Sequence, residues 1–309
     1  MMLANFFGKS KPVNFILISV LFILYVILFS VVYNFENIHI ELWIHILEGF
    51  IVFLVLFFLY NFIVSENRLT QDNSYAFLFF VISLGFLPNV VSDFKTVIIS
   101  LLLLMFLREI YSLRRPKAVL KKLFDAGLWL GFPFILEPFT VVFFLLIFTA
   151  IILFIKVTIR TIVIPVLGFA TPLFLYYTYC FYTNQMSLFT YLFEFTFSYD
   201  FSIYNTPFYQ LTFGFFGFFV LLSIIARSSK IFSVRNRFKK SWILLLSHLI
   251  VAIVFVVLLR THSGAEMIAV SIPVTIIIAN WIQSVKKKEV TDVVLALFLV
   301  FSFAIHFIV

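Results

Sequence analysis

The sequence predicts an all-α fold, a polytopic bundle of transmembrane helices, and three observations support this prediction. Hydrophobic residues make up 63% of the 309 residues, and charged residues make up only 12%. Apolar stretches recur along the whole chain, and many approach the roughly 20 residues that a helix needs to cross a bilayer. The basic residues fall between these stretches, where they can mark one side of a membrane.

Eleven candidate spans follow when the chain is read with that length. They are Val13–Tyr33, Leu42–Val64, Tyr75–Val91, Thr96–Leu107, Leu123–Leu136, Phe139–Ile155, Thr161–Phe181, Phe208–Ala226, Trp242–Leu259, Met267–Ile282 and Val293–Val309. The fourth and fifth are short, so we expect them to extend into their flanks or to be embedded without crossing fully. The loops are too short for a domain with its own core. We therefore predict a single transmembrane domain over residues 1–309, with additional C-terminal spans over residues 208–309.

The charges predict the orientation of the chain. If the N-terminus is cytoplasmic, all of the 22 Lys and Arg residues except Lys95 and Arg260 fall on the cytoplasmic side. Basic residues are retained on that side during insertion, so we predict a cytoplasmic N-terminus and a location in the bacterial inner membrane. Basic loops beside membrane spans also contact anionic headgroups. The net charge of +8 therefore does not indicate a nucleic-acid-binding protein.

The loop after the seventh candidate span alternates aromatic and polar residues. Phe189, Tyr191, Phe193, Phe195, Phe197, Tyr199 and Phe201 occupy every second position, and most residues between them are polar. This period of two is typical of an extended strand with one apolar face. It also fits an irregular segment in the headgroup zone, where aromatic rings are favoured. Such a loop can anchor the protein at the interface, or it can form a platform for a lipid tail or a sugar.

Acidic residues gather on the predicted outer side, opposite most of the cations. They are Glu36, Glu41, Glu48, Asp93, Glu137, Glu194, Asp200 and Glu266, and His39, His45 and His262 lie on the same side with Lys95 and Arg260. A carboxylate can act as general base toward a hydroxyl, while Lys or Arg balances a phosphate. This arrangement predicts a site for a substrate that carries phosphate and hydroxyl groups. Outer acids are tolerated by the insertion machinery, so they can also be solvated independently.

Two acidic positions and the cysteine need separate comment. Glu48 lies about two helical turns inside the second candidate span, where an ionisable group faces a bundle interior or a watery cavity. His45 is three residues earlier on the same helix face, and the pair can be structural or catalytic. Glu137 precedes Pro138 at a break between two spans, and its side chain can be solvated or point into an outer cavity. The one cysteine, Cys180, excludes an intrachain disulfide and a multi-thiol metal site.

Two resemblances add to these observations. The run from Arg108 to Phe139 reads R-E-I-Y-S-L-R-R-P-K-A-V-L-K-K-L-F-D-A-G-L-W-L-G-F-P-F-I-L-E-P-F. This basic loop, short helix and proline-containing outer turn resemble the multi-pass GT-C glycosyltransferases, which use polyprenyl-phosphate sugars. The resemblance covers about the first 210 residues and implies a catalytic acid in the first outer loop, matched here by Glu36 and Glu41, and a second at Asp93. The start M-L-A-N-F-F-G-K-S-K-P-V-N-F is similar to uncharacterised inner-membrane proteins of Bacteroidota.

The leading hypothesis is therefore a GT-C-like glycosyltransferase that moves a sugar from a polyprenyl-phosphate donor to an acceptor at the outer face. We expect Glu36 or Glu41 as the base, and Asp93 and Glu48 as supporting acids. The expected substrate-binding residues are Arg260 and Lys95 as phosphate contacts, with His39, His45, Glu137 and His262. The alternatives are a non-catalytic scaffold or subunit of an envelope complex, and a transporter of small solutes or lipids. The expected partner is membrane lipid, and the sequence assigns no cofactor, metal or protein partner.

Overall fold

The computed structural model describes residues 2–33, 40–90, 93–197, 199–231 and 236–308. All regular secondary structure in these residues is helical, and they contain no strand. Within the described residues, five helices are long and apolar enough to cross a membrane by length and composition. They are Pro12–Phe29, Ile159–Tyr182, Pro207–Ser229, Phe238–Leu258 and Lys288–Ile308. The fold class predicted from the sequence is therefore confirmed as all-α with several candidate membrane spans.

The chain forms two compact units, which we describe separately. Unit 1 consists of Met1–Val97, Asp200–Val234 and His262–Val309, and unit 2 consists of Ile98–Tyr199 and Arg235–Thr261. The helix α5 (Phe94–Ser112) begins in unit 1 and continues into unit 2. Each unit is thus assembled from segments that are far apart in the sequence.

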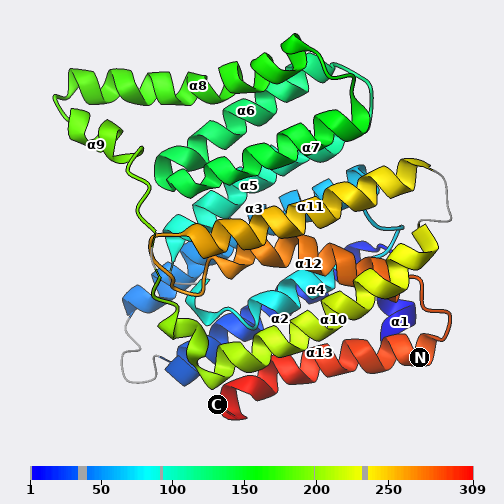
Figure 1. Ribbon diagram of the computed structural model, residues 1–309. Helices are drawn as coiled ribbons and strands as arrows, with labels where there is room; N and C mark the ends of the chain where they lie inside the picture. The colour runs from blue at the N-terminus through cyan, green and yellow to red at the C-terminus, as the bar shows by residue number, and fades with distance from the viewer. Residues whose placement is uncertain (1, 34–39, 91–92, 198, 232–235, 309) are drawn as a thin grey trace. The chain divides into compact units, whose positions relative to one another are not determined.

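Unit 1 is built around two apolar helices, α4 and α12. Its elements are α1 (Met2–Phe7), α2 (Pro12–Tyr33), α3 (Ile40–Glu66), α4 (Tyr75–Leu84), the 3-10 turns η2 (Pro88–Val90) and η4 (Ser202–Asn205), α10 (Pro207–Ile231), α12 (Met267–Ile282) and α13 (Lys288–Ile308). All ten residues of α4 are buried, and α4 packs against α2, α3, α12 and α13 (Figure 1). A helix that is apolar on every side is expected in such a central position.

Polar side chains join the helices of unit 1 at a few buried points. The Tyr25 hydroxyl lies 2.6 Å from the Ser302 hydroxyl, which links α2 to α13. The Tyr60 hydroxyl lies 2.7 Å from that of Thr275, which links α3 to α12. Between helices in an apolar environment such hydrogen bonds add to van der Waals packing. They hold the bundle in the register that positions its loops.

Unit 2 contains a close pair of helices, α6 and α8. Its elements are the larger part of α5, then α6 (Val119–Leu136), the 3-10 turn η3 (Pro138–Phe143), α7 (Phe144–Phe154), α8 (Ile159–Tyr182), α9 (Met186–Tyr191) and α11 (Asn236–Leu258). A Cβ atom on Gly127 would lie 1.9 Å from the Pro165 carbonyl oxygen, and one on Gly168 would lie 2.1 Å from that of Phe124. The two backbones therefore approach each other where glycine occurs, as is common at helix interfaces in membranes.

The aromatic loop after α8 does not form a strand in the residues that the structure describes. After the short helix α9, residues 192–197 have turn or irregular structure. The Phe195 and Phe197 rings lie 5.6 and 5.4 Å from the Phe139 ring, within unit 2. The strand interpretation is wrong because these rings pack onto η3 instead of forming one side of a sheet. An irregular segment at the membrane interface remains a prediction.

Candidate functional site

A polar cluster in unit 1 forms around the turn before α12. This turn, His262–Glu266, meets the start of α5 and the 3-10 turn η4. Gly264 adopts a φ of +84°, and a Cβ atom there would lie 1.8 Å from the Tyr209 hydroxyl oxygen. Glycine is needed for both reasons, because it tolerates positive φ and has no side chain to displace the tyrosine. The Asn89 amide also donates to the Ser263 carbonyl oxygen at 2.5 Å and fixes the turn to η2.

Glu266 is the central acceptor of the cluster. Its Oε2 accepts hydrogen bonds from the Ser263 backbone N–H and hydroxyl, both at 3.1 Å. Its Oε1 accepts from the Tyr204 hydroxyl and lies 3.3 Å from His262 Nδ1. A carboxylate has about four lone-pair sites, and these four partners occupy them. Glu266 is therefore an orienting group in this arrangement and has no free site with which to take a proton from a substrate.

His262 is held by Glu266 on one side of its ring and has an unpartnered nitrogen on the other. The side chain is 1% exposed, and its Nε2 has no hydrogen-bond partner among the described residues. Because a carboxylate only accepts, Nδ1 donates to Glu266, and Nε2 of the neutral ring is left as an acceptor. The Phe201 ring stacks on the imidazole at 4.7 Å, and the Tyr204 ring lies 5.6 Å away. A buried polar atom without a partner in a native protein calls for an explanation, and a catalytic role is one.

Asp93 has a structural role and also contacts the cluster. It precedes α5 and accepts hydrogen bonds from the Thr96 backbone N–H at 3.0 Å and the Thr96 hydroxyl at 2.7 Å. This geometry is that of an N-cap. Asp93 Oδ2 also lies 3.3 Å from the Ser263 hydroxyl oxygen, which contacts Glu266 as well. Ser263 has one hydroxyl proton, so it can donate to only one of the two carboxylates at a time.

Two ionisable groups beside the cluster have shifted pKa values. Burial, followed by the hydrogen bond to Glu266, raises the pKa of Tyr204 above its ordinary value. Hydrogen bonds from Ser202 lower the pKa of the exposed Asp200 carboxyl, and the charge of His262 contributes in the same direction. The Tyr204 phenol therefore stays a donor over the neutral range, while Asp200 adds negative charge near the imidazole.

The structure brings two of the expected site residues, Asp93 and His262, together; Lys95 follows Asp93 in unit 1, and Arg260 and Glu137 belong to unit 2. Asp93 and His262 both contact the turn that contains Ser263 and Glu266. Lys95 lies in the first turn of α5, with an exposed side chain. Arg260 belongs to unit 2, where its guanidinium donates to the Tyr191 and Glu194 carbonyl oxygens and lies over the Tyr191 ring.

Glu137 also belongs to unit 2, where it ends α6. Its backbone N–H donates to the Pro133 carbonyl oxygen at 2.7 Å, and its side chain is buried. The solvated alternative for this residue is therefore wrong, since the residue is only 8% exposed.

The remaining expected residues lie outside what the structure describes. Glu36 and His39 fall in the undescribed segment 34–39. Glu41, His45 and Glu48 belong to α3, but their side chains lie outside the described part of the chain. Their roles as base, supporting acid and substrate contacts stay predictions.

Sequence reasoning missed the most connected residues of the cluster. From the sequence, Glu266 is one of the outer acids without an assigned role, and no sequence pattern singles out Ser263 or Tyr204. One signal was present, because Glu266 follows His262 by four residues. No group of three or more His, Cys, Asp or Glu residues in the described chain is placed to hold a metal ion.

The fold and the cluster define a class: a helical protein with several helices fit to cross a membrane and a histidine–carboxylate site in its loops. The chain belongs to DUF6427, a family of unknown function whose family model matches residues 6–308. This agrees with the resemblance of its N-terminal sequence to an uncharacterised family. No curated protein and no solved structure matches the chain.

Proposed function

We propose that the protein is a polytopic inner-membrane protein with about eleven spans, a cytoplasmic N-terminus and its histidine–carboxylate cluster at the outer face. Asp93, Tyr204 and His262 come from three loops that this topology places outside, and they meet in one cluster. Loops assigned to the inner side also meet within unit 1. Lys288 donates to Asn5, and Gln283 accepts from the Gln71 backbone N–H at 2.9 Å.

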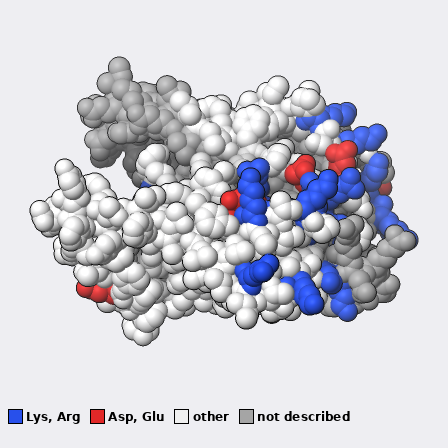
Figure 2. Space-filling view, turned by 90° about the horizontal axis from the view of Figure 1, so that it is seen from above, with Lys and Arg blue, Asp and Glu red and all other residues white. Residues whose placement is uncertain are grey.

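The cations of unit 2 support the same topology. They are Arg108, Arg114, Arg115, Lys117, Lys121, Lys122, Lys156, Arg160, Arg235, Arg237, Lys239, Lys240 and Arg260. Six of them, from Arg108 to Lys122, lie where α5 ends and α6 begins. Two more, Lys156 and Arg160, lie where α7 ends and α8 begins. Figure 2 shows Lys and Arg gathered toward one end of the visible face, whose remaining surface carries few charges. Such clustering is the pattern that cytoplasmic retention of basic residues produces.

We further propose that the cluster activates a hydroxyl group for sugar transfer from a polyprenyl-phosphate donor. The geometry of His262 is the main support for this proposal. Its Nδ1 is hydrogen-bonded to Glu266, and its Nε2 has no hydrogen-bond partner among the described residues. In the reaction, Nε2 takes the proton of the acceptor hydroxyl as its oxygen attacks the anomeric carbon of the sugar. The bond from that carbon to the phosphate oxygen breaks, and the polyprenyl phosphate leaves with the electron pair. A positioned base of this kind contributes about 100-fold to 10,000-fold in rate.

The other groups have supporting roles in this proposal. Glu266 fixes the tautomer and orientation of His262 and stabilises the imidazolium that forms, as the carboxylate does in other histidine–carboxylate pairs. Asp93 adds a second negative charge on the far side of Ser263. Phe201 stacks on one face of the imidazole and helps to hold the ring in its orientation, while the Nε2 lone pair lies in the ring plane. The choice of a polyprenyl-phosphate sugar as the donor rests on the resemblance to GT-C enzymes.

One observation favours a second candidate, a non-catalytic membrane scaffold. Every oxygen of Asp93 and Glu266 has a hydrogen-bond partner within the protein. Such a network can serve only to tie η4, α5 and the turn before α12 together. The two candidates predict different results when the His262 imidazole is removed. For the transferase, sugar transfer is lost, whereas for the scaffold only the stability of the protein falls.

The test is a sugar-transfer assay with purified protein in lipid nanodiscs. Radiolabelled polyprenyl-phosphate hexoses serve as donors and a long-chain alkyl glucoside serves as acceptor. We expect His262→Gln to lower transfer by about 100-fold or more. His306→Gln is the matched control, because His306 lies in the same unit and donates to the Gly85 carbonyl oxygen at 2.7 Å. Rates are divided by the folded fraction of each variant.

Unchanged transfer in His262→Gln would refute the base assignment. If the wild-type protein transfers no sugar and His262→Gln changes only the unfolding temperature, the scaffold candidate is the better one. Glu36→Ala and Glu41→Ala belong in the same series, since the sequence predicts one of these carboxylates as the base. Loss of transfer in either of them with full activity in His262→Gln would move the base to the first outer loop.

A further inference from the structure

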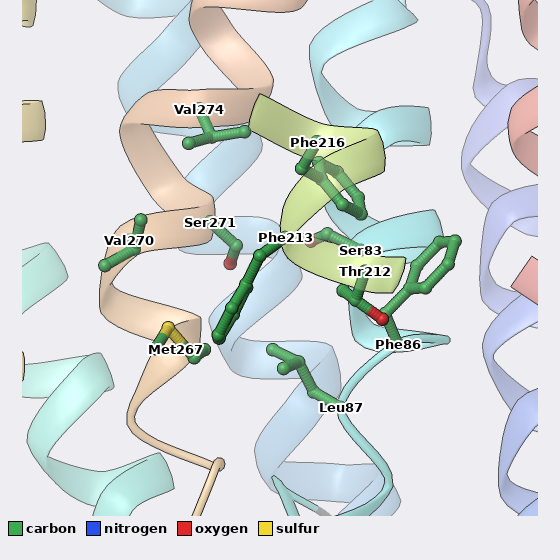
Figure 3. A pocket seen from close by; sticks show the side chains of 10 residues that line it. All are labelled: Ser83, Phe86, Leu87, Thr212, Phe213, Phe216, Met267, Val270, Ser271 and Val274. Carbon is green, nitrogen blue, oxygen red and sulfur yellow. The ribbon is translucent and has the colours of Figure 1, made fainter. Parts of the chain in front are cut away.

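Unit 1 contains an apolar cavity between α4, α10 and α12. Its volume is about 80 Å³, and Phe86, Phe213, Phe216, Met267, Val270 and Val274 form most of its wall (Figure 3). This is roughly half of the about 150 Å³ of an apolar cavity that binds benzene. The cavity therefore fits a short stretch of hydrocarbon chain, with the rest of the chain outside.

Three hydroxyl groups line the cavity, but they are turned into their own helices. Each donates to a backbone carbonyl oxygen: Ser83 to Phe80 at 2.6 Å, Thr212 to Phe208 at 2.8 Å, and Ser271 to Ile268 at 2.8 Å. The wall consequently offers no free hydrogen-bond donor to a guest. A water molecule needs two to four polar partners, so this surface favours an apolar occupant.

The cavity and the histidine–carboxylate cluster share parts of their walls. Met267, which lines the cavity, directly follows Glu266 in the chain. Phe213, whose ring projects toward the centre of the cavity, lies 5.5 Å from the Tyr204 ring. Tyr204 in turn donates to Glu266. One molecule can therefore place an apolar part in the cavity and a polar part at the cluster.

The cluster selects the polar part by charge. Asp93 and Glu266 lie on either side of Ser263, and the exposed Asp200 interacts electrostatically with His262. Like charges at these distances repel, so a phosphate is disfavoured at the position beside His262 that the head hydroxyl occupies. Hydroxyl groups are favoured, because they can donate to His262 Nε2 and to the exposed Asp200 carboxylate.

We propose that the cavity and the cluster together bind an uncharged lipid with a hydroxyl-bearing head, such as a glycolipid or a long-chain alcohol. Its hydrocarbon chain enters between α10 and α12, and its head hydroxyl lies at His262. Membrane lipid is the source, since α10 is one of the helices long and apolar enough to cross a bilayer. The assignment of this lipid as the acceptor rests on the proposed function, whereas its binding does not.

The test is photo-crosslinking in nanodiscs with two probes that share one diazirine-bearing alkyl chain. One probe is an alkyl glucoside and the other is the matching alkyl phosphate. We expect the glucoside to label the peptide that contains Met267 about tenfold more strongly than the phosphate does. Unlabelled alkyl glucoside should compete for this labelling, and unlabelled alkyl phosphate should not. These measurements on the unaltered protein do not depend on the folding of any variant.

A pair of matched substitutions tests whether the hydrocarbon chain of the lipid binds in the cavity. Val270→Phe fills the cavity and should lower labelling on the order of tenfold. Val300→Phe makes the same change on α13 at a residue that is 67% exposed, and labelling should stay within about twofold. Equal labelling by both probes would contradict the preference for a hydroxyl-bearing head group over a phosphate. If Val270→Phe is folded and is labelled as strongly as the wild-type protein, the hydrocarbon chain of the lipid does not bind in this cavity.

The wild-type protein separates this inference from the proposed function. His262→Gln should lower both sugar transfer and labelling by the glucoside probe, because it removes the nitrogen that accepts the head hydroxyl. Specific labelling without any transfer by the wild-type protein supports the lipid site and refutes the transferase. Transfer without labelling at Met267 refutes the lipid site alone.

Discussion

Glu266 accepts four hydrogen bonds from three residues, and this concentration of donors explains the local geometry. His262 and Ser263 reach it because the positive φ of Gly264 reverses the chain between them and α12. Tyr204 reaches it from η4. The orientation of the imidazole thus depends on contacts from two separate segments, which is the kind of support that a positioned catalytic group requires.

The first residue-scale prediction concerns Tyr204→Phe, which removes one donor to Glu266. We expect the substitution to lower the free energy of unfolding at pH 7 by about 1.5 kcal/mol, the usual contribution of a hydrogen bond to a charged group. Thermal unfolding in detergent measures the change. Tyr199→Phe is the control, because Tyr199 is 87% exposed. An equal loss in both variants would show that the Tyr204 hydrogen bond does not stabilise the protein.

The stabilisation from Tyr204 should also depend on pH. Burial and the Glu266 hydrogen bond raise the pKa of Tyr204 in the folded protein, so the folded state holds this proton more tightly than the unfolded state. Its contribution is therefore complete below the unfolded pKa of about 10 and declines as the pH rises above that value. The stability difference between the wild-type protein and Tyr204→Phe should be constant from pH 7 to 9 and shrink above about pH 10. A difference that grows with pH would contradict this account.

At the residue scale, the sequence predicted Asp93 and His262 but not the residues that connect them. The residue type of each and its place in a predicted outer loop indicate both. Glu266 and Tyr204 acquire their roles only when η4 meets the turn before α12, and no local pattern specifies which loops meet. Arg260 and Glu137 were expected at the same site from charge alone, and the structure assigns both to unit 2.

Among the helices, the contact between α6 and α8 is the most sensitive to side-chain size. We predict that Gly127→Ala destabilises the protein by about 1–3 kcal/mol, because the new methyl group would overlap the Pro165 carbonyl oxygen. Gly217→Ala on α10 is the matched control, since a Cβ atom there meets nothing within 4 Å. It should be neutral or stabilising by up to about 1 kcal/mol. Thermal unfolding that ranks the two variants in the opposite order would contradict the close helix contact.

Helix positions were more predictable than helix lengths. Each of the eleven expected spans overlaps a helix, because apolar stretches bounded by polar loops favour helices in a membrane. Several helices continue into polar flanks, as α13 does from Lys288. The ten-residue α4 is shorter than its expected span because the chain turns at Gly85 and Pro88. Its apolar sequence fits both burial and contact with lipid, and its packing against α2, α3, α12 and α13 decides for burial.

Over the whole molecule, the proposed topology accounts for which loops meet. Loops assigned to the outer side supply the histidine–carboxylate cluster, and those assigned to the inner side carry almost all cations. The cluster is available to a lipid or sugar at the outer face only if this sorting holds in the membrane.

Single-cysteine labelling in bacterial spheroplasts tests this claim most directly. Cys180 is replaced by serine, and one new cysteine is introduced at an exposed position, either Asn205→Cys beside Tyr204 or Lys117→Cys in a basic loop. With a membrane-impermeant maleimide, we predict that Asn205→Cys reacts in intact spheroplasts and that Lys117→Cys reacts only after lysis. Reaction of Lys117→Cys in intact spheroplasts, or protection of Asn205→Cys until lysis, would contradict the account.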